Sequence, residues 1–166
     1  MFMFKKMKAD VYLNSVFEID TKALKAKGIR GILFDIDNTL EPYRTAKPGK
    51  AVRQLFEKLG REGFKIGVIS NAKMERALEF CEGATSFWIA GAGKPLARGY
   101  RQLAAMMELE PEELAAVGDQ LYTDILGGNN FGCYTIYVKP IEKKEPPFVA
   151  FKRLLEKPFM KGIFYA

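Results

Sequence analysis

Acidic, hydroxyl and amine side chains follow four separate apolar runs of this sequence, at the points where those runs end. They stand in Asp35-Ile36-Asp37-Asn38-Thr39, in Ser70-Asn71, in Gly93-Lys94-Pro95, and in Gly118-Asp119-Gln120 with Thr123-Asp124. Because the carboxyl ends of parallel strands meet at one edge of an open sheet, we expect all four groups at a single rim. There the carboxylates could bind a cation, attack an electrophile or move a proton, and the amine could hold an anion.

The pair Asp35 and Asp37 suits a nucleophile and a proton donor. Strand alternation would point both carboxylates to the same face, but if the strand ends between them, the second can turn over the first across a bound phosphate. An aspartate at a strand end can equally cap a helix or lie in a solvated loop. Asp-x-Asp also occurs in metal-dependent glycosyl transfer, so the pair alone leaves its chemistry open.

The elements that would position these groups are five apolar runs, which alternate with segments of helical periodicity. The predicted strands cover 31–34, 65–69, 86–89, 114–117 and 134–138, and the predicted helices cover 50–59, 73–80, 96–107 and 122–129. This alternation predicts an α/β fold: a single Rossmann-like, doubly wound parallel sheet of about five strands with helices on both faces. The composition changes after Pro140, and a further helix is expected at about 148–156.

Composition is that of a globular protein, and we expect residues 1–166 to form a single domain. Apolar residues make up 48% and charged residues 28% of the chain, which excludes a disordered or collagen-like protein. Cys81 and Cys133 lie far apart and histidine is absent, so Cys/His zinc patterns are excluded and a reducing cytosol fits. Neither a signal-peptide pattern nor an apolar run of roughly 20 residues is present, so a cytoplasmic protein is expected.

Basic and aromatic residues gather in the terminal segments, at about 1–20 and 141–166, and the net charge is +6. They include Phe2, Phe4, Lys5 and Lys6, which stand beside Met1 and Met3, and then Phe148, Phe151, Lys152, Arg153, Lys157, Phe159, Lys161 and Phe164. The charge favours an anionic partner: phosphate groups, nucleic acid or an acidic lipid surface. Interfacial segments often have this pattern, although the aromatic side chains could equally pack on the domain. No nucleic-acid-binding module is recognisable, which disfavours a specific nucleic acid.

The four motifs together resemble those of the haloacid dehalogenase (HAD) superfamily. Asp35-Ile36-Asp37-Asn38-Thr39-Leu40 resembles its first motif, D-x-D-x-T, Ser70 the second, Lys94 before Pro95 the third, and Gly118-Asp119 with Asp124 the acidic fourth. Their order and their positions at strand ends make the combination specific. More narrowly, Asp-Ile-Asp-Asn-Thr-Leu with Gly-Asp-Gln-Leu-Tyr-Thr-Asp-Ile looks like the YqeG-type branch of subfamily IIIA, which is similar to phosphatidylglycerophosphate phosphatases. The resemblance implies a HAD-like fold.

The resemblance also implies a role for each motif residue. Asp35 would attack phosphorus to form an aspartyl-phosphate, and Asp37 would protonate the leaving oxygen and later activate water. Mg²⁺ would be held by Asp35, Asp119 and the backbone carbonyl of Asp37, with Asp124 in support. The substrate phosphate would be bound by Ser70, Asn71 and Lys94. The chain is thus expected to be a magnesium-dependent phosphomonoester hydrolase.

A large cap domain is not expected, because 41–65 and 72–94 are mostly occupied by predicted helices and a strand. An uncapped site would admit phosphate groups on bulky bodies. One hypothesis is therefore a lipid phosphate such as phosphatidylglycerophosphate, hydrolysed at the inner membrane surface by a peripherally bound enzyme. The alternatives are a soluble sugar phosphate, a nucleotide or a phosphoprotein, and a regulatory module that binds phosphate without turnover. The sequence decides neither the substrate nor the oligomeric state.

Overall fold

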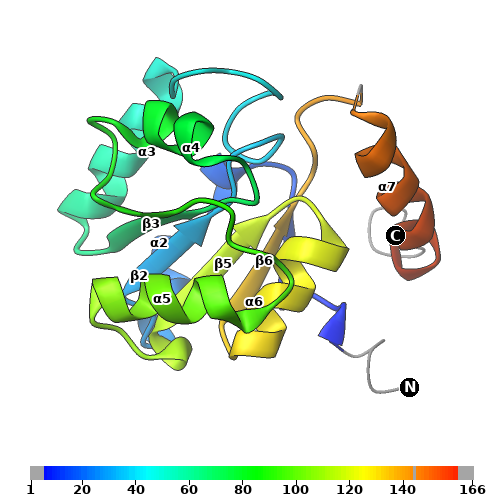
Figure 1. Ribbon diagram of the computed structural model, residues 1–166. Helices are drawn as coiled ribbons and strands as arrows, with labels where there is room; N and C mark the ends of the chain where they lie inside the picture. Colours follow the sequence, from blue (N-terminus) through cyan, green and yellow to red (C-terminus); the bar gives the residue numbers. More distant parts are fainter. Residues whose placement is uncertain (1–5, 144, 161–166) are drawn as a thin grey trace.

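The structure of the protein is a computed structural model that describes residues 6–143 and 145–160. Within these residues, a parallel sheet of six strands lies between two layers of helices (Figure 1). The strands are β1 (Val11–Leu13), β2 (Gly31–Phe34), β3 (Lys65–Ile69), β4 (Phe87–Ile89), β5 (Leu114–Gly118) and β6 (Tyr134–Val138). Their order in the sheet is β1-β6-β5-β2-β3-β4, and every neighbouring pair is parallel. The predicted doubly wound α/β sheet is therefore confirmed.

The number of strands differs from the predicted five, because the prediction missed β1. This strand has three residues, all half-buried, at the edge of the sheet, so it has no long apolar run to reveal it. It pairs with β6, where Val11 lies opposite Ile136. Asp10 fixes the register, since its carboxylate accepts hydrogen bonds from the backbone N–H (2.8 Å) and the hydroxyl (3.0 Å) of Thr135.

Five helices of the described residues pack on the sheet. One face is covered by α2 (Thr21–Ala26), α3 (Lys50–Arg61) and α4 (Met74–Cys81), and the other by α5 (Ala97–Met107) and α6 (Leu126–Phe131). Helix α3 shows why these segments fold as they do, because its buried residues recur at helical spacing: Val52, Leu55, Phe56 and Leu59. Burying each such side chain contributes about 1.5–3 kcal/mol. Helix α2 was not predicted; its first turn is capped by the side chain of Asp20.

In the part of the chain that the structure describes, the connections contain three short helical turns, η1 (Val16–Glu18), η2 (Pro111–Glu113) and η3 (Leu121–Ile125). The predicted helix at 122–129 is split, because η3 is a π-helical turn and only α6 is α-helical. The C-terminal helix, α7 (Pro147–Met160), is longer than predicted at both ends. The terminal residues 1–5 and 161–166 lie outside the described residues, and so does Lys144. The expectations for Met1, Phe2, Met3, Phe4, Lys5, Lys161 and Phe164 therefore stay predictions.

No inserted cap domain interrupts the α/β order of the described residues. Instead, α7 follows the last strand and stands beside the sheet at its carboxyl edge (Figure 1), where Phe148, Val149 and Lys152 line the same pocket as Asp35. The described residues thus contain no large cap domain, as expected, and α7 borders the pocket. Within the described residues, no helix combines the length and the apolar character that a membrane span requires.

Gly99 lets α5 lie directly against the loop that carries Lys94. A Cβ atom at this position would come within 2.7 Å of the carbonyl oxygen and 3.1 Å of the Cα atom of Ala92. Backbone atoms cannot swing away as a flexible side chain can, so a larger residue must push α5 and this loop apart. The glycine thus couples the packing of α5 to the position of the site.

We predict that Gly99→Ala lowers the free energy of unfolding by about 1–3 kcal/mol, because of this backbone clash. Gly60→Ala in α3 is the matched control, since a Cβ there meets nothing within 4 Å. It should raise stability by about 0.5–1 kcal/mol, because alanine loses less conformational entropy in a helix. Urea unfolding followed by circular dichroism measures both. Equal effects of the two substitutions would contradict this account of Gly99.

Candidate active site

The site begins where two neighbouring strands end. β2 and β5 are paired with Phe34 opposite Val117, so Asp35 and Asp119, which follow these strands, leave the sheet side by side. The backbone N–H of Asp35 donates to the carbonyl oxygen of Val117 at 3.0 Å and extends the ladder by one residue. Both side chains are buried, with only 6% of Asp35 and 0% of Asp119 exposed. The sheet register itself therefore forces two carboxylates together.

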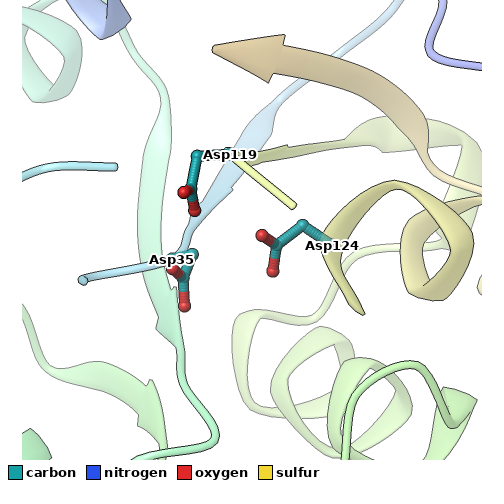
Figure 2. A group of neighbouring side chains, drawn as sticks. All are labelled: Asp35, Asp119 and Asp124. Carbon is teal, nitrogen blue, oxygen red and sulfur yellow. The ribbon is translucent and has the colours of Figure 1, made fainter. Parts of the chain in front are cut away.

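Asp124 completes a group of three carboxylates that converge on one point (Figure 2). The π-helical turn η3 folds back directly after β5, and the carboxylate of Asp124 accepts the backbone N–H of Gln120 at 3.0 Å. Gly118 makes room for this, because a Cβ there would lie 2.3 Å from both Cβ and Cγ of Asp124. One oxygen from each of Asp35, Asp119 and Asp124 lies within 4.8 Å of the others.

Lys94 is the cation buried among these carboxylates. Its Nζ lies 2.6 Å from Asp35 Oδ1, 2.6 Å from Asp124 Oδ1 and 3.0 Å from the carbonyl oxygen of Ile69. Asn71 holds the backbone of Lys94 in place: its side-chain oxygen accepts the Lys94 N–H at 2.8 Å, and its amide donates to the Lys94 carbonyl at 3.1 Å. Asn71 was predicted to bind phosphate, and the structure gives its side chain a positioning contact as well.

A pocket of about 240 Å³ opens over Asp35. Its lining brings together five of the predicted site residues, Asp35, Asp37, Ser70, Asn71 and Lys94, with seven others, Tyr43, Ala72, Gln120, Thr123, Phe148, Val149 and Lys152. Asp119 and Asp124 do not line it and belong to the buried group with Asp35. The hydroxyl oxygen of Ser70 accepts the N–H of Ala72 at 3.1 Å, so its hydrogen can still be donated to an anion in the pocket.

Asp37 also lines the pocket. Unlike the three buried carboxylates, it pairs with a partly exposed arginine. Arg76, on α4, donates from Nη2 to Asp37 Oδ1 at 3.0 Å and from Nη1 to the carbonyl of Ala46 at 3.3 Å. Both side chains of the pair are partly exposed, at 20% and 24%. Arg76 was not predicted as a site residue, since one arginine in an amphipathic helix carries no local signal. The contact keeps the Asp37 carboxylate oriented.

Thr39 and Asn38 form hydrogen bonds that connect the turn after β2 with other segments of the chain. The hydroxyl of Thr39 lies 3.0 Å from Asp119 Oδ1 and 3.4 Å from Asp35 Oδ2, between the two carboxylates. Asn38, in the left-handed region with φ 65°, accepts the N–H of Glu142 at 2.7 Å and donates to its carbonyl at 2.9 Å. The two hydrogen bonds of Asn38 therefore hold the turn after β2 against the segment that leads into α7.

Arg153 is the principal site contact that the sequence analysis missed. From α7 its guanidinium donates to the side chain and to the backbone carbonyl of Asp119. It also donates to Glu145 at 2.7 Å and lies 3.5 Å from Glu156. The sequence indicates Arg153 only as one of the basic residues of the C-terminal segment, because it lies 29 residues beyond the last motif residue and a helical pattern does not show which side faces a site. Three carboxylates surround the Arg153 guanidinium, so ion pairs hold α7 beside the site.

Electrostatics at the site follow from burial. Burial raises the pKa of Asp35 to about 7, with Lys94 opposing and Asp124 adding to the rise. Burial also raises the pKa of Asp119, against the attraction of Arg153. Although burial alone would lower it, the pKa of Lys94 is raised by Asp124 and Asp35, so Lys94 stays protonated. Additional positive charge near the carboxylates would favour their ionised forms.

The residues present fit a divalent cation. Three buried carboxylates offer oxygen ligands within 4.8 Å of one another, and hard cations such as Mg²⁺ and Ca²⁺ prefer oxygen. Lys94 and Arg153 supply two positive charges against three negative ones, Asp35, Asp119 and Asp124, so a negative charge is left over for a cation to balance. Mutual repulsion of the carboxylates falls when such an ion is bound.

Fold and site together are those of a haloacid dehalogenase-like hydrolase, and the chain belongs to this family. The family model described as "haloacid dehalogenase-like hydrolase" matches residues 44–132. That range contains Ser70, Lys94, Asp119 and Asp124 and begins after Asp35. The chain is therefore an enzyme of the hydrolase class, as the four motifs predicted.

Its relatives within the family are named as phosphatases. The chain is 30% identical over 154 residues to "Probable phosphatase YqeG" of Bacillus subtilis (strain 168), covering 93% of this chain and 90% of that protein. It is 31% identical over 151 residues to "Phosphatidylglycerophosphate phosphatase 1, chloroplastic" of Chlamydomonas reinhardtii, covering 84% of this chain and 55% of the algal protein. The crystal structure of a HAD phosphatase from Thermococcus onnurineus matches with a TM-score of 0.59 over 76% of this chain and 98% of that one. At 13% identity, this last likeness supports the fold alone.

We predict that Lys94→Met lowers the free energy of unfolding by about 3–5 kcal/mol, because it leaves buried carboxylates without their cation. Lys94→Met combined with Asp124→Asn should recover at least about 1 kcal/mol of that loss, since it also removes one of the unpaired charges. Urea unfolding of the wild type, the two single variants and the double variant completes the cycle. If Lys94→Met alone stayed within about 1 kcal/mol of the wild type, Lys94 would not hold the site together.

Proposed function

We propose that the chain is a magnesium-dependent phosphomonoester hydrolase that acts through an aspartyl-phosphate on Asp35. The observation that carries the proposal is the buried contact of Asp35 with Lys94, next to Asp119 and Asp124, at the base of a pocket that Asp37 also lines. A carboxylate, a cation and a second carboxylate beside one pocket are the groups that phosphoryl transfer to an aspartate needs. We also propose that residues 1–166 act as one hydrolase domain.

In the first step, a carboxylate oxygen of Asp35 attacks phosphorus and the bond from phosphorus to the ester oxygen breaks. Asp37 gives its proton to the leaving oxygen, so the alcohol departs neutral. In the second step, Asp37 takes a proton from water, the water oxygen attacks phosphorus, and inorganic phosphate and free Asp35 are released. Ser70, Asn71 and Lys94 hold the phosphoryl oxygens and offset their charge through both steps.

Mg²⁺ would be held by Asp35, Asp119 and the backbone carbonyl of Asp37, with Asp124 in support. When bound, it would neutralise charge on the transferring phosphoryl group. The four predicted metal residues are supported in this role by the burial of three of them and by their oxygen-only chemistry. Thr39, which lies between Asp35 and Asp119, keeps the two carboxylates oriented.

The substrate class we propose is a lipid phosphate with a small polar head group, such as phosphatidylglycerophosphate. A relative at 31% identity bears that substrate in its name. In this chain, Phe148, Val149 and Lys152 line the same pocket as Asp35, so apolar and cationic side chains surround the phosphate position. Within the described residues, the side-chain oxygen of Gln120 is buried without a hydrogen-bond partner, and a head-group hydroxyl could satisfy it. A substrate of this kind would place the enzyme at the inner surface of a membrane.

We predict that Asp35→Asn lowers kcat at least about 1,000-fold while the fold stays intact, because an amide is nearly isosteric but not nucleophilic. Asp20→Asn is the matched control: Asp20 caps α2, and asparagine caps helices equally well, so turnover should not change. Phosphate release from a soluble ester and circular dichroism measure the two effects. Activity of Asp35→Asn within about tenfold of the wild type would contradict the covalent mechanism.

We predict that EDTA abolishes turnover, that Mg²⁺ restores it and that Ca²⁺ does not. Ca²⁺ accepts longer and looser coordination, which would misplace the nucleophile relative to phosphorus. Thermal unfolding gives a readout independent of turnover: Mg²⁺ should raise the melting temperature of the wild type, because it offsets the repulsion among the carboxylates, and should raise that of Asp119→Asn much less. Full turnover in excess chelator would remove the metal from the mechanism.

We predict that kcat/KM for phosphatidylglycerophosphate in detergent micelles exceeds that for a soluble sugar phosphate by at least about tenfold. The same preparation is assayed on both esters at equal Mg²⁺. A soluble ester that is better by the same factor would end the lipid assignment and leave the phosphatase assignment in place. Binding of inorganic phosphate without turnover of any ester would instead support a regulatory module.

A further inference from the structure

Helix α7 has its apolar side turned outward. Four large apolar residues are strongly exposed: Phe148 by 69%, Phe151 by 58%, Leu154 by 55% and Leu155 by 44%. At 3.6 residues per turn, these four positions fall on one side of the helix, together with Pro147 and Pro158. We call this side, residues Phe148, Phe151, Leu154 and Leu155, the outer face of α7. A surface helix of a globular protein normally buries such a side.

The inner side of α7 is charged, and its charges are engaged with the protein. Arg153 donates to Asp119 and Glu145, and Glu156, which is 2% exposed, accepts the backbone N–H of Tyr122 at 3.1 Å. Rolling the helix to bury its apolar side would pull these buried charges away from their partners, which is strongly unfavourable for an ion in a low-dielectric interior. The outer face therefore stays outward for a definite physical reason and needs an apolar partner to cover it.

Cations border the outer face. Lys152 lies at one margin with its Nζ 4.5 Å from the centre of the Phe148 ring, and the exposed Lys157 lies near the other. The only acidic residue of α7, Glu156, belongs to the inner side. A second copy of the chain would bring the same cations against themselves in a two-fold contact, which disfavours self-association. An apolar strip with basic margins matches the interface of an anionic bilayer.

The outer face is also continuous with the mouth of the catalytic pocket. Phe148, which belongs to the face, and Lys152, at its margin, both line the pocket over Asp35. Figure 1 shows α7 beside the carboxyl edge of the sheet, with its far side turned away from the α/β layers. A surface that covers the outer face would therefore bring its head groups to the pocket mouth.

We propose that the outer face of α7 docks the protein on the surface of an anionic lipid bilayer and aligns the pocket with the lipid head groups. The choice of lipid as partner rests on the proposed function, whereas the surface itself does not. The apolar side chains enter the boundary between head groups and acyl chains, and Lys152 and Lys157 pair with lipid phosphates. Arg153 and Glu156 hold the helix in the required orientation.

Vesicle flotation of the full chain tests the proposal without any substrate. Vesicles of phosphatidylcholine with about one third phosphatidylglycerol should carry the protein, and vesicles of phosphatidylcholine alone should carry much less. Raising the salt should weaken binding, because the contribution of the two lysines is screened. Phe151→Ser combined with Leu154→Ser should reduce the bound fraction at least about tenfold, since it removes the centre of the apolar strip.

The matched control combines Leu78→Ser with Met106→Ser, at exposed apolar residues of α4 and α5. It should bind vesicles within about twofold of the wild type, because these residues lie on other surfaces. Neither Phe151 nor Leu154 lines the pocket, so both double variants should hydrolyse a soluble ester at the wild-type rate. A variant that loses vesicle binding but keeps this activity is folded.

Three outcomes would overturn the proposal: wild type that fails to float with anionic vesicles, equal loss of binding in the control, or a dimer in sedimentation that only Phe151→Ser with Leu154→Ser disrupts. The last result would assign the outer face to a second copy. Each of these results is compatible with full phosphatase activity. Absence of turnover with intact vesicle binding would instead overturn the proposed function and leave the docking surface standing.

Discussion

The structure depends on one constraint: three carboxylates, Asp35, Asp119 and Asp124, are buried close enough to share a single ion. Like charges at such distances in a low-dielectric interior repel strongly, so the group exists only where cations and hydrogen-bond donors surround it. Lys94 supplies the first cation from the loop between β4 and α5, and Asn71 fixes its backbone. The parallel register, the clearance at Gly118 and the approach of α5 at Gly99 all serve this arrangement.

The same constraint explains the C-terminal segment. Asp119 takes its counter-charge from Arg153, on a helix that follows the last strand, and Asn38 fastens the turn after β2 to the segment before that helix. The chain therefore covers part of its site with α7 rather than with an inserted domain. Because the charged side of α7 contacts Asp119 and Glu145, its apolar side faces outward. One helix therefore supplies both a charged contact to the buried site and an exposed apolar surface.

Much of this could be predicted from the sequence. The apolar runs that form β2 to β6 and the strand-end positions of Asp35, Ser70 and Asp119 follow from local patterns, because buried parallel strands read as continuous apolar stretches. Edge strand β1 could not be found in this way, since three half-buried residues carry no period. Contacts between distant segments were also hidden, above all that of Arg153 with Asp119. An arginine in an amphipathic helix has the same sequence signature whether it faces solvent or a buried carboxylate.

The central claim is that phosphate passes through a covalent bond to Asp35. The most direct test is to stop turnover of a soluble phosphate ester with acid during the first catalytic cycle and to map the protein by mass spectrometry. Aspartyl-phosphates survive brief exposure to acid, and the account predicts one phosphoryl group on the peptide that contains Asp35, formed and lost at rates that match product release. Product formation at the full rate with Asp35 unmodified, or with the phosphoryl group on Ser70, would contradict it.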